Sequence, residues 1–173
     1  MIIALIIIAV FIGIVIGIIN AAKQGVRDSK ELKQNTEAYS PSQTARMKHI
    51  SGLPLPSGIT VDVAYCDDKI VFVKESQNYV IRKENISYME AMDGKTLQGQ
   101  AADAAAGMLL FGVAGAALGA LSSTSTYLVI AFESNGEAKN IVLDCNNNIP
   151  FVRSVLKEYQ REKTNRPPET IEL

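Results

Sequence analysis

The stretch ITVDVAYCDDKIVFVKESQNYVIRKENISYMEAM at residues 59–92 decides the fold of this chain. In its first eight residues, large apolar side chains alternate with polar or smaller ones, a pattern typical of strands with one buried face. Asp67-Asp68 and Gln77-Asn78 separate the apolar runs and predict tight hairpin turns. Glu84-Asn85 is expected to bend the last run into two strands. The stretch therefore predicts four consecutive antiparallel strands.

A second β region follows at 124–145. Two apolar runs flank Asn135-Gly136, and Asn-Gly between such runs is the strongest short-range signal for a hairpin. The apolar spacing then becomes helical, with Asn148 placed to cap the helix and Pro150 in its first turn. The expected apolar face consists of Phe151, Val152, Val155, Leu156 and Tyr159.

These elements predict an α+β fold. A mainly antiparallel β-sheet or barrel occupies residues 49–163, a Gly/Ala-rich apolar insertion interrupts it at 98–122, and a C-terminal amphipathic helix covers an open end or face of the sheet. A polar tail follows at 164–173.

The run of hairpins closed by a C-terminal helix resembles the pleckstrin-homology/GRAM-like fold of small bacterial domains. The stretch KHISGLPLPSGITVDVAYCDDKIVF (48–72) is similar to the opening of uncharacterised bacterial proteins of this kind. The resemblance implies a scaffold and no particular activity. Phosphoinositide-binding versions of the fold carry a basic cluster in the first hairpin turn, whereas this turn, Cys66-Asp67-Asp68-Lys69, is acidic.

The N-terminal run IIALIIIAVFIGIVIGII (2–19) contains no charged or polar side chain. Eighteen residues of helix span roughly 27 Å, close to the hydrocarbon thickness of about 30 Å. The run is apolar on all sides, which suits lipid better than a protein core. It lacks a basic n-region and an A-x-A site, so a retained signal-anchor at 1–20 is favoured over a cleaved signal peptide.

Basic residues follow the apolar run, at Lys23, Arg27, Lys30 and Lys33, and none precedes it. The positive-inside rule therefore predicts a single-pass protein of the cell membrane, with its N-terminus outside and its C-terminal domain in the cytoplasm. The four residues serve as topology determinants, or they contact lipid headgroups. Residues 21–48 are expected to form a polar juxtamembrane helix and a linker, with the helix fraying near Ser40-Pro41.

The insertion contains a second apolar run, AAAGMLLFGVAGAALGAL, at 104–121. Small residues recur at spacing four in two rows, a glycine-zipper-like pattern that lets helices approach closely. These candidate helix-packing and oligomerisation residues are Gly112, Gly115, Ala116, Gly119 and Ala120. Three arrangements remain open: the run dips into the membrane and returns, packs against protein including its own copies, or spans the bilayer. Spanning would separate the two halves of one sheet.

Composition limits the chemistry. The chain has 17 basic and 18 acidic residues, one His and two Cys, which argues against nucleic-acid binding and against a site that needs several histidines. His49 is expected on the surface, Asp67 and Asp68 in a turn, and Cys66 and Cys145 as free thiols. No nucleophile elbow or dinucleotide fingerprint occurs, so no catalytic, metal or cofactor residue is assigned.

The sequence thus predicts a non-catalytic, membrane-anchored interaction or scaffolding module. Its expected partners are membrane lipid, a second copy of the chain through 104–121, and a protein bound at the β domain. The alternative is a self-associating membrane assembly or pore built through the glycine-rich segment. Regulation of an enzyme through the sheet edge is a third hypothesis.

Overall fold

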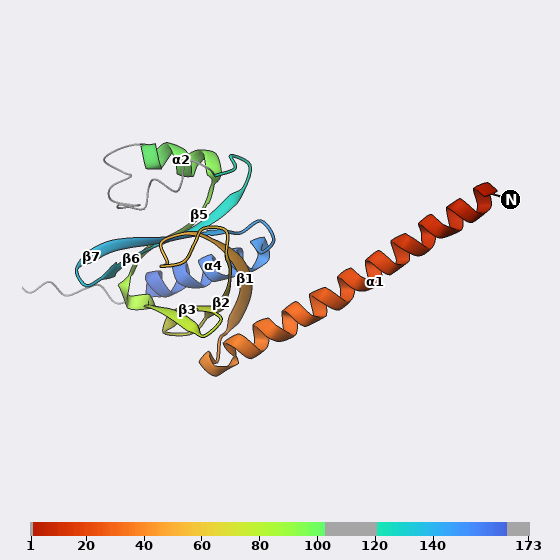
Figure 1. Ribbon diagram of the computed structural model, residues 1–173. Helices are drawn as coiled ribbons and strands as arrows, with labels where there is room; N and C mark the ends of the chain where they lie inside the picture. Colours follow the sequence, from red (N-terminus) through yellow and green to blue (C-terminus); the bar gives the residue numbers. More distant parts are fainter. Residues whose placement is uncertain (1, 103–120, 166–173) are drawn as a thin grey trace, which may run out of the picture.

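The computed structural model describes the backbone of residues 2–102 and 121–165, and the side chains of 11–99 and 121–165. The protein is α+β, with one seven-stranded antiparallel sheet and helices around it (Figure 1). The elements in chain order are α1 (Ile2–Thr36), η1 (Glu37–Tyr39), β1 (Gln43–Ser51), β2 (Thr60–Tyr65), β3 (Lys69–Lys74), β4 (Gln77–Arg82), η2 (Lys83–Asn85), β5 (Ile86–Asp93), α2 (Gly94–Ala102), β6 (Thr126–Ser134), β7 (Glu137–Asp144) and α4 (Ile149–Asn165).

The sheet has the order β4-β3-β2-β1-β7-β6-β5. Two meanders, β1 to β4 and β5 to β7, are joined because β1 pairs with β2 on one side and with β7 on the other. Gly52, just after β1, has φ of +98°, and a Cβ there would lie 1.8 Å from the carbonyl oxygen of Asn140 on β7. Only glycine therefore fits where β1 leaves β7.

Helix α4 packs on the sheet through the face that the sequence predicted. Val152, Val155 and Tyr159 are buried in one apolar cluster with side chains of the sheet. Pro150 stands in the first turn of α4, as expected. The side-chain amide of Asn148, just before the helix, donates to the Arg46 carbonyl oxygen on β1 at 2.6 Å. At its other end, Lys163 Nζ donates to the Ser87 carbonyl oxygen. The amphipathic helix thus closes the core and is tied to the sheet at both ends.

The predicted hairpins are present, with one shift. Asn135 and Gly136 form the two-residue β6–β7 turn with φ of 57° and 74°, as their sequence indicated. The β3–β4 turn lies at Glu75-Ser76, two residues before the predicted Gln77-Asn78. Glu75 takes the left-handed conformation there, with φ of 55°. Side-chain pairing across the hairpin thus outweighed the preference of Gln-Asn for a turn.

The first strand was not predicted. Residues 43–48, expected to belong to a linker within 21–48, form most of β1, so the sheet begins before the predicted boundary at residue 49. The inward side chains of β1 are Ala45, Met47, His49 and Ser51. Only one of these is large and apolar, which explains why apolar periodicity did not reveal the strand.

Helix α1 is a single run of 35 residues that projects away from the sheet (Figure 1). It continues past the apolar segment as expected, but it ends at Thr36, before the predicted fraying point. A short η1 turn and Ser40 in the left-handed conformation (φ 49°) then lead through Pro41 into β1. Only the C-terminal part of α1 reaches the sheet, where it lies against β1 and β2.

Candidate functional site

The apolar residues of α1 between Phe11 and Ile19 are exposed to solvent. Phe11, Ile14 and Ile18 expose 68, 55 and 64% of their surface, and Ile12, Val15, Ile16 and Ile19 are exposed as well. Exposed contiguous apolar surface of this kind marks contact with a membrane or another protein. Among the residues that the structure describes, no helix is long and apolar enough to cross a bilayer.

A salt bridge between β1 and β2 forms the centre of the junction between α1 and the sheet. Arg46 and Asp62 are direct cross-strand partners. Arg46 Nε donates to Asp62 Oδ1 at 2.7 Å, and Arg46 Nη2 donates to Asp62 Oδ2 at 3.1 Å. Asp62 is 5% exposed. Because a buried carboxylate is costly without a partner, this two-point pairing accounts for its presence there.

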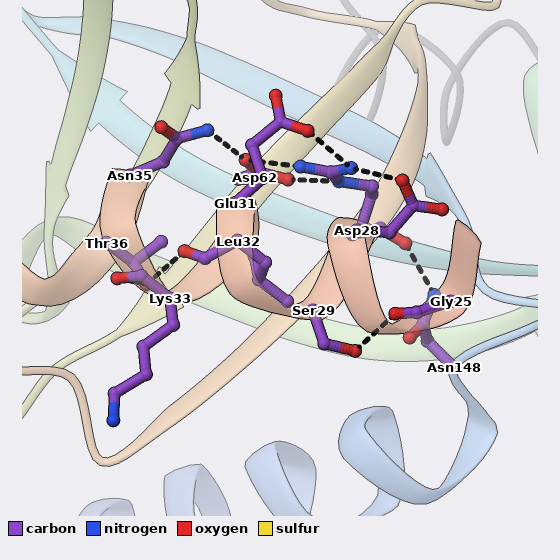
Figure 2. Close-up of polar contacts among 11 residues, drawn as sticks. Gly25, Asp28, Ser29, Glu31, Leu32, Lys33, Asn35, Thr36, Asp62 and Asn148 are labelled. Carbon is purple, nitrogen blue, oxygen red and sulfur yellow. Dashed lines mark hydrogen bonds and ion pairs between the residues drawn. The ribbon is translucent and has the colours of Figure 1, made fainter. Parts of the chain in front are cut away.

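Acidic and amide side chains of α1 complete the network around this pair (Figure 2). Arg46 Nη1 lies 3.6 Å from Asp28 Oδ1 and 3.5 Å from Glu31 Oε2. One turn further along, Asn35 Nδ2 donates to Asp62 Oδ2 at 2.8 Å. The hydrogen bonds and ion pairs between this helix and the sheet therefore go to Arg46 and to its partner Asp62.

The electrostatics of the junction favour charged Arg46. Its pKa is raised, first by its hydrogen bond to Asp62, while partial burial opposes the shift. At the foot of the helix, Thr36 is buried and its hydroxyl donates to the Leu32 carbonyl oxygen at 2.7 Å. This bond to the carbonyl four residues earlier gives the buried hydroxyl a partner within the helix.

The predicted topology residues lie on another face of α1. Lys23, Arg27, Lys30 and Lys33 are all exposed, and none forms an ion pair with any residue the structure describes. Figure 2 shows the Lys33 side chain directed away from Asp62. The structure thus places the four together on one helix and separates them from the acidic residues of the same helix.

The predicted helix-packing residues Gly112, Gly115, Ala116, Gly119 and Ala120 lie outside the described part of the chain, but both stems of the insertion are described. The backbone N–H of Gly94 donates to the Ser125 carbonyl oxygen at 2.9 Å. Gln98 Nε2 donates to the Leu121 carbonyl oxygen at 2.7 Å. The chain therefore leaves and re-enters the described structure at adjacent points beside β5 and β6.

The hydrogen bond between Gln98 and Leu121 limits how residues 104–121 can be arranged relative to a membrane. A single bilayer crossing would place the ends of the run on opposite sides of about 30 Å of hydrocarbon. Gln98 touches Leu121, and Ala102 is only four residues beyond Gln98, so the described ends lie on the same side. The single-span arrangement therefore does not fit the sheet, which leaves the other two open.

The prediction that His49 is a surface residue is wrong. The imidazole is 1% exposed and faces inward from β1. Its Nε2 accepts a hydrogen bond from the Leu53 backbone N–H at 3.0 Å, and its Nδ1 lies 3.3 Å from the Pro56 carbonyl oxygen. The ring therefore holds the 52–58 loop against the sheet. This role follows from the inward position of His49 on β1, a strand that the sequence pattern did not predict.

The two cysteines are free, as predicted, and both are buried. Burial raises the pKa of Cys66, and it raises that of Cys145 to about 12. Cys66 Sγ contacts the Tyr39 carbonyl oxygen just after α1, whereas Cys145 belongs to the apolar cluster under α4. Both thiols are therefore held protonated, in structural positions.

Asp67, Asp68 and Asp93 have structural roles. Asp67 and Asp68 lie in the β2–β3 turn, as expected. Asp93 caps α2: its carboxylate accepts from the Thr96 backbone N–H and hydroxyl at 2.8 and 2.9 Å, and these bonds lower its pKa.

A hollow of about 810 Å³ lies between the β2–β3 turn, η2 and the end of α4, with a lining that mixes acidic and basic side chains. Among the described residues, no group of three His, Cys, Asp or Glu could hold a metal.

The chain matches no protein-family model and no curated protein. The site therefore has to be interpreted from its own geometry. Its distinctive features are the exposed apolar part of α1 and a set of polar contacts that fasten this helix to the sheet. This set, called the polar dock, consists of the contacts of Asp28, Glu31 and Asn35 with Arg46 and Asp62.

Proposed function

We propose that this protein is a non-catalytic, membrane-anchored interaction or scaffolding module. The observation that carries the proposal is the exposure of Phe11, Ile14 and Ile18 on a helix that leaves the domain. No part of the described domain covers these side chains, so an apolar phase outside it has to do so. The uncharged run 2–19 matches the thickness of a bilayer, which favours lipid as that phase.

The basic residues support an orientation. Lys23 and Arg27 follow the apolar run directly and Lys30 and Lys33 continue the series, which favours a cytoplasmic domain and an N-terminus outside. The polar dock at Arg46 would then hold the sheet beside the juxtamembrane part of α1. Positioning a binding surface at the membrane, without turnover, is the mechanism that this arrangement suits.

The domain is proposed to be pleckstrin-homology/GRAM-like. The supporting features are two antiparallel meanders joined through β1 and a C-terminal helix packed on their apolar side. The acidic β2–β3 turn does not favour phosphoinositide as its ligand. The sheet is instead proposed to bind a protein partner.

Cysteine labelling tests the orientation. Cys66 and Cys145 are buried and suit this purpose poorly, whereas Ser76 in the β3–β4 turn is exposed. In intact cells, a membrane-impermeant maleimide should leave S76C unlabelled and should label it fully after permeabilisation. Labelling of S76C in intact cells would overturn the orientation. Wild-type protein is the control for the two native thiols.

A second candidate is a self-associating membrane assembly or pore. It is favoured by the hydrogen bond between Gln98 and Leu121, which holds together the described segments before and after the apolar small-residue run. Gly115→Leu and Gly119→Leu would remove the close approach of helices that such an assembly requires. A detergent-solubilised complex that shrinks in both variants supports this candidate. A monomer that neither variant alters removes it.

A further inference from the structure

The charged residues of α1 are divided between two sides of the helix. With about 100° of rotation per residue, Lys23, Arg27, Lys30 and Lys33 fall within an arc of about 120°. This set is called the basic face. Asp28, Glu31 and Asn35, which contact Arg46 or Asp62, fall together with the buried Thr36 in an arc centred on the opposite side. The only two acidic residues between 20 and 36 are thus turned toward the sheet.

Arg46 keeps the basic face unneutralised. Glu31 lies four residues after Arg27, a spacing that allows an ion pair within a helix. In the structure Glu31 is instead 3.5 Å from Arg46, and Asp28 is bound to the same guanidinium. Because α1 gives both of its carboxylates to the sheet, its basic side chains have no acidic partner among the described residues.

We propose that the basic face binds an anionic membrane surface and tilts the juxtamembrane helix toward it, which carries the domain on the side of α1 turned away from the bilayer. The inference rests on the proposed membrane anchoring. The anionic headgroup is favoured over an acidic protein because the face begins three residues after Asn20, next to the apolar run. In a structure whose helix is unbroken to Thr36, the far end of the face can approach the headgroups only if α1 tilts.

The length of the basic face along α1 determines how strongly an upright helix would be attracted to the membrane surface. Lys33 is thirteen residues beyond Asn20, which is roughly 20 Å along the helix axis. In an upright helix this exceeds the Debye length of about 10 Å at 0.1 M salt, so Lys33 would feel little attraction. Each basic residue near an anionic surface adds attraction, and the gain is largest when all four are close to it. Tilt should therefore depend on lipid charge.

The test uses the full chain with a spin label at Q34C, an exposed position within the basic face. The protein is reconstituted in vesicles of phosphatidylcholine alone or mixed with phosphatidylglycerol, and collisions of the label with a water-soluble nickel chelate are measured. Anionic lipid should lower the collision rate by roughly twofold or more, and salt at about 1 M, where the Debye length is about 3 Å, should reverse the change. Equal rates in the two vesicles would overturn the proposal and leave an acidic protein as the occupant.

Two variant pairs and a second label make the result decisive. Lys30→Gln with Lys33→Gln should abolish the response to anionic lipid. Lys95→Gln with Lys157→Gln changes the charge equally at exposed positions away from α1 and should preserve the response. A label at I16C should be shielded from the chelate in both vesicles. If I16C is exposed to water, the membrane anchoring itself fails, an outcome distinct from the failure of the basic face.

Discussion

Helices α1 and α4 both carry many apolar side chains but use them in opposite ways. In α4, Val152, Val155 and Tyr159 are buried against the sheet, while the other side of the helix is polar. In α1, apolar residues such as Phe11 and Ile18 are exposed, and the hydrogen bonds and ion pairs to the sheet come from Asp28, Glu31 and Asn35. The domain thus accounts for the apolar residues of α4 and leaves those of α1 unexplained. This difference supports the proposal that the apolar half of α1 lies in a membrane.

The largest effect is expected from placing the same charge on each helix. Val155→Asp puts a carboxylate into the core, and we expect a loss of at least about 3 kcal/mol in the free energy of unfolding. Phe11→Asp should leave the unfolding of the domain unchanged. It should instead weaken membrane insertion by about 2.5–3.5 kcal/mol, the cost of Asp near the centre of a membrane helix.

Urea unfolding and membrane fractionation, applied to both variants, check this contrast. A domain destabilised by Phe11→Asp would show that the apolar half of α1 packs on the sheet. A membrane defect in a folded Val155→Asp protein would show that α4 shares the anchoring role.

The second effect sharpens the contrast between polar and apolar docking. Arg46→Met leaves the buried Asp62 carboxylate with the Asn35 amide as its remaining partner from α1, so we expect a loss of about 2–4 kcal/mol, reduced by the partial exposure of Arg46. Adding Asp62→Asn should recover part of this loss because it removes the unpaired charge. Denaturant titration measures both.

Arg82→Met is the matched control for Arg46→Met. Arg82 pairs with Glu84 at 3.4 Å, and both side chains are largely exposed. Its replacement should change stability by no more than about 0.5 kcal/mol. Equal losses at Arg46 and Arg82 would contradict a special role for the junction.

The smallest effect concerns the thiols, one beside each helix. Cys66 lies at the foot of α1 and Cys145 under α4. Because the dock of α1 is polar and local, we expect Cys66 to react faster than Cys145 with a thiol reagent under native conditions. Arg46→Met should accelerate the reaction of Cys66 alone. Mass spectrometry of labelled peptides resolves the two sites, and equal rates would indicate that both thiols react only after global unfolding.

Alkaline pH provides a related test. The pKa of Cys145 in the folded protein, about 12, exceeds its ordinary value of 9.0, so folding favours the protonated thiol. The contribution is complete below pH 9 and is lost as the pH rises toward 12. Stability should therefore decline over this interval, and Cys145→Val should decline less.

Local signals predicted much of the fold. Apolar runs between turn residues located β2, β3 and β5 to β7, and they located β4 with its start shifted by two residues. Asn135-Gly136 located its turn, and helical spacing located α4 with its buried face. The single large apolar residue among those that β1 turns inward is Met47, so this strand was missed and His49 was placed on the surface. The core position of an imidazole depends on the 52–58 loop folding over it, which no local pattern reveals.

The contact between α1 and the sheet could not be predicted from the sequence for a similar reason. Arg46 and Asp62 are sixteen residues apart and meet only because β1 and β2 pair in a particular register. Had β1 been recognised, opposite charges directly across a strand pair would have been the signal. The part of the site that the sequence did contain was the apolar run and the series of basic residues after it.

Fractionation of the full chain tests the central claim most directly. We predict that the full-length protein stays with the membrane pellet after extraction at alkaline pH. The chain without residues 1–22, which keeps Asp28, Glu31 and Asn35 for the dock, should be soluble and folded. If the deleted chain stays in the pellet, a second membrane contact exists outside residues 1–22. Release of the full-length protein into the soluble fraction would contradict the assignment of the apolar half of α1 to the membrane.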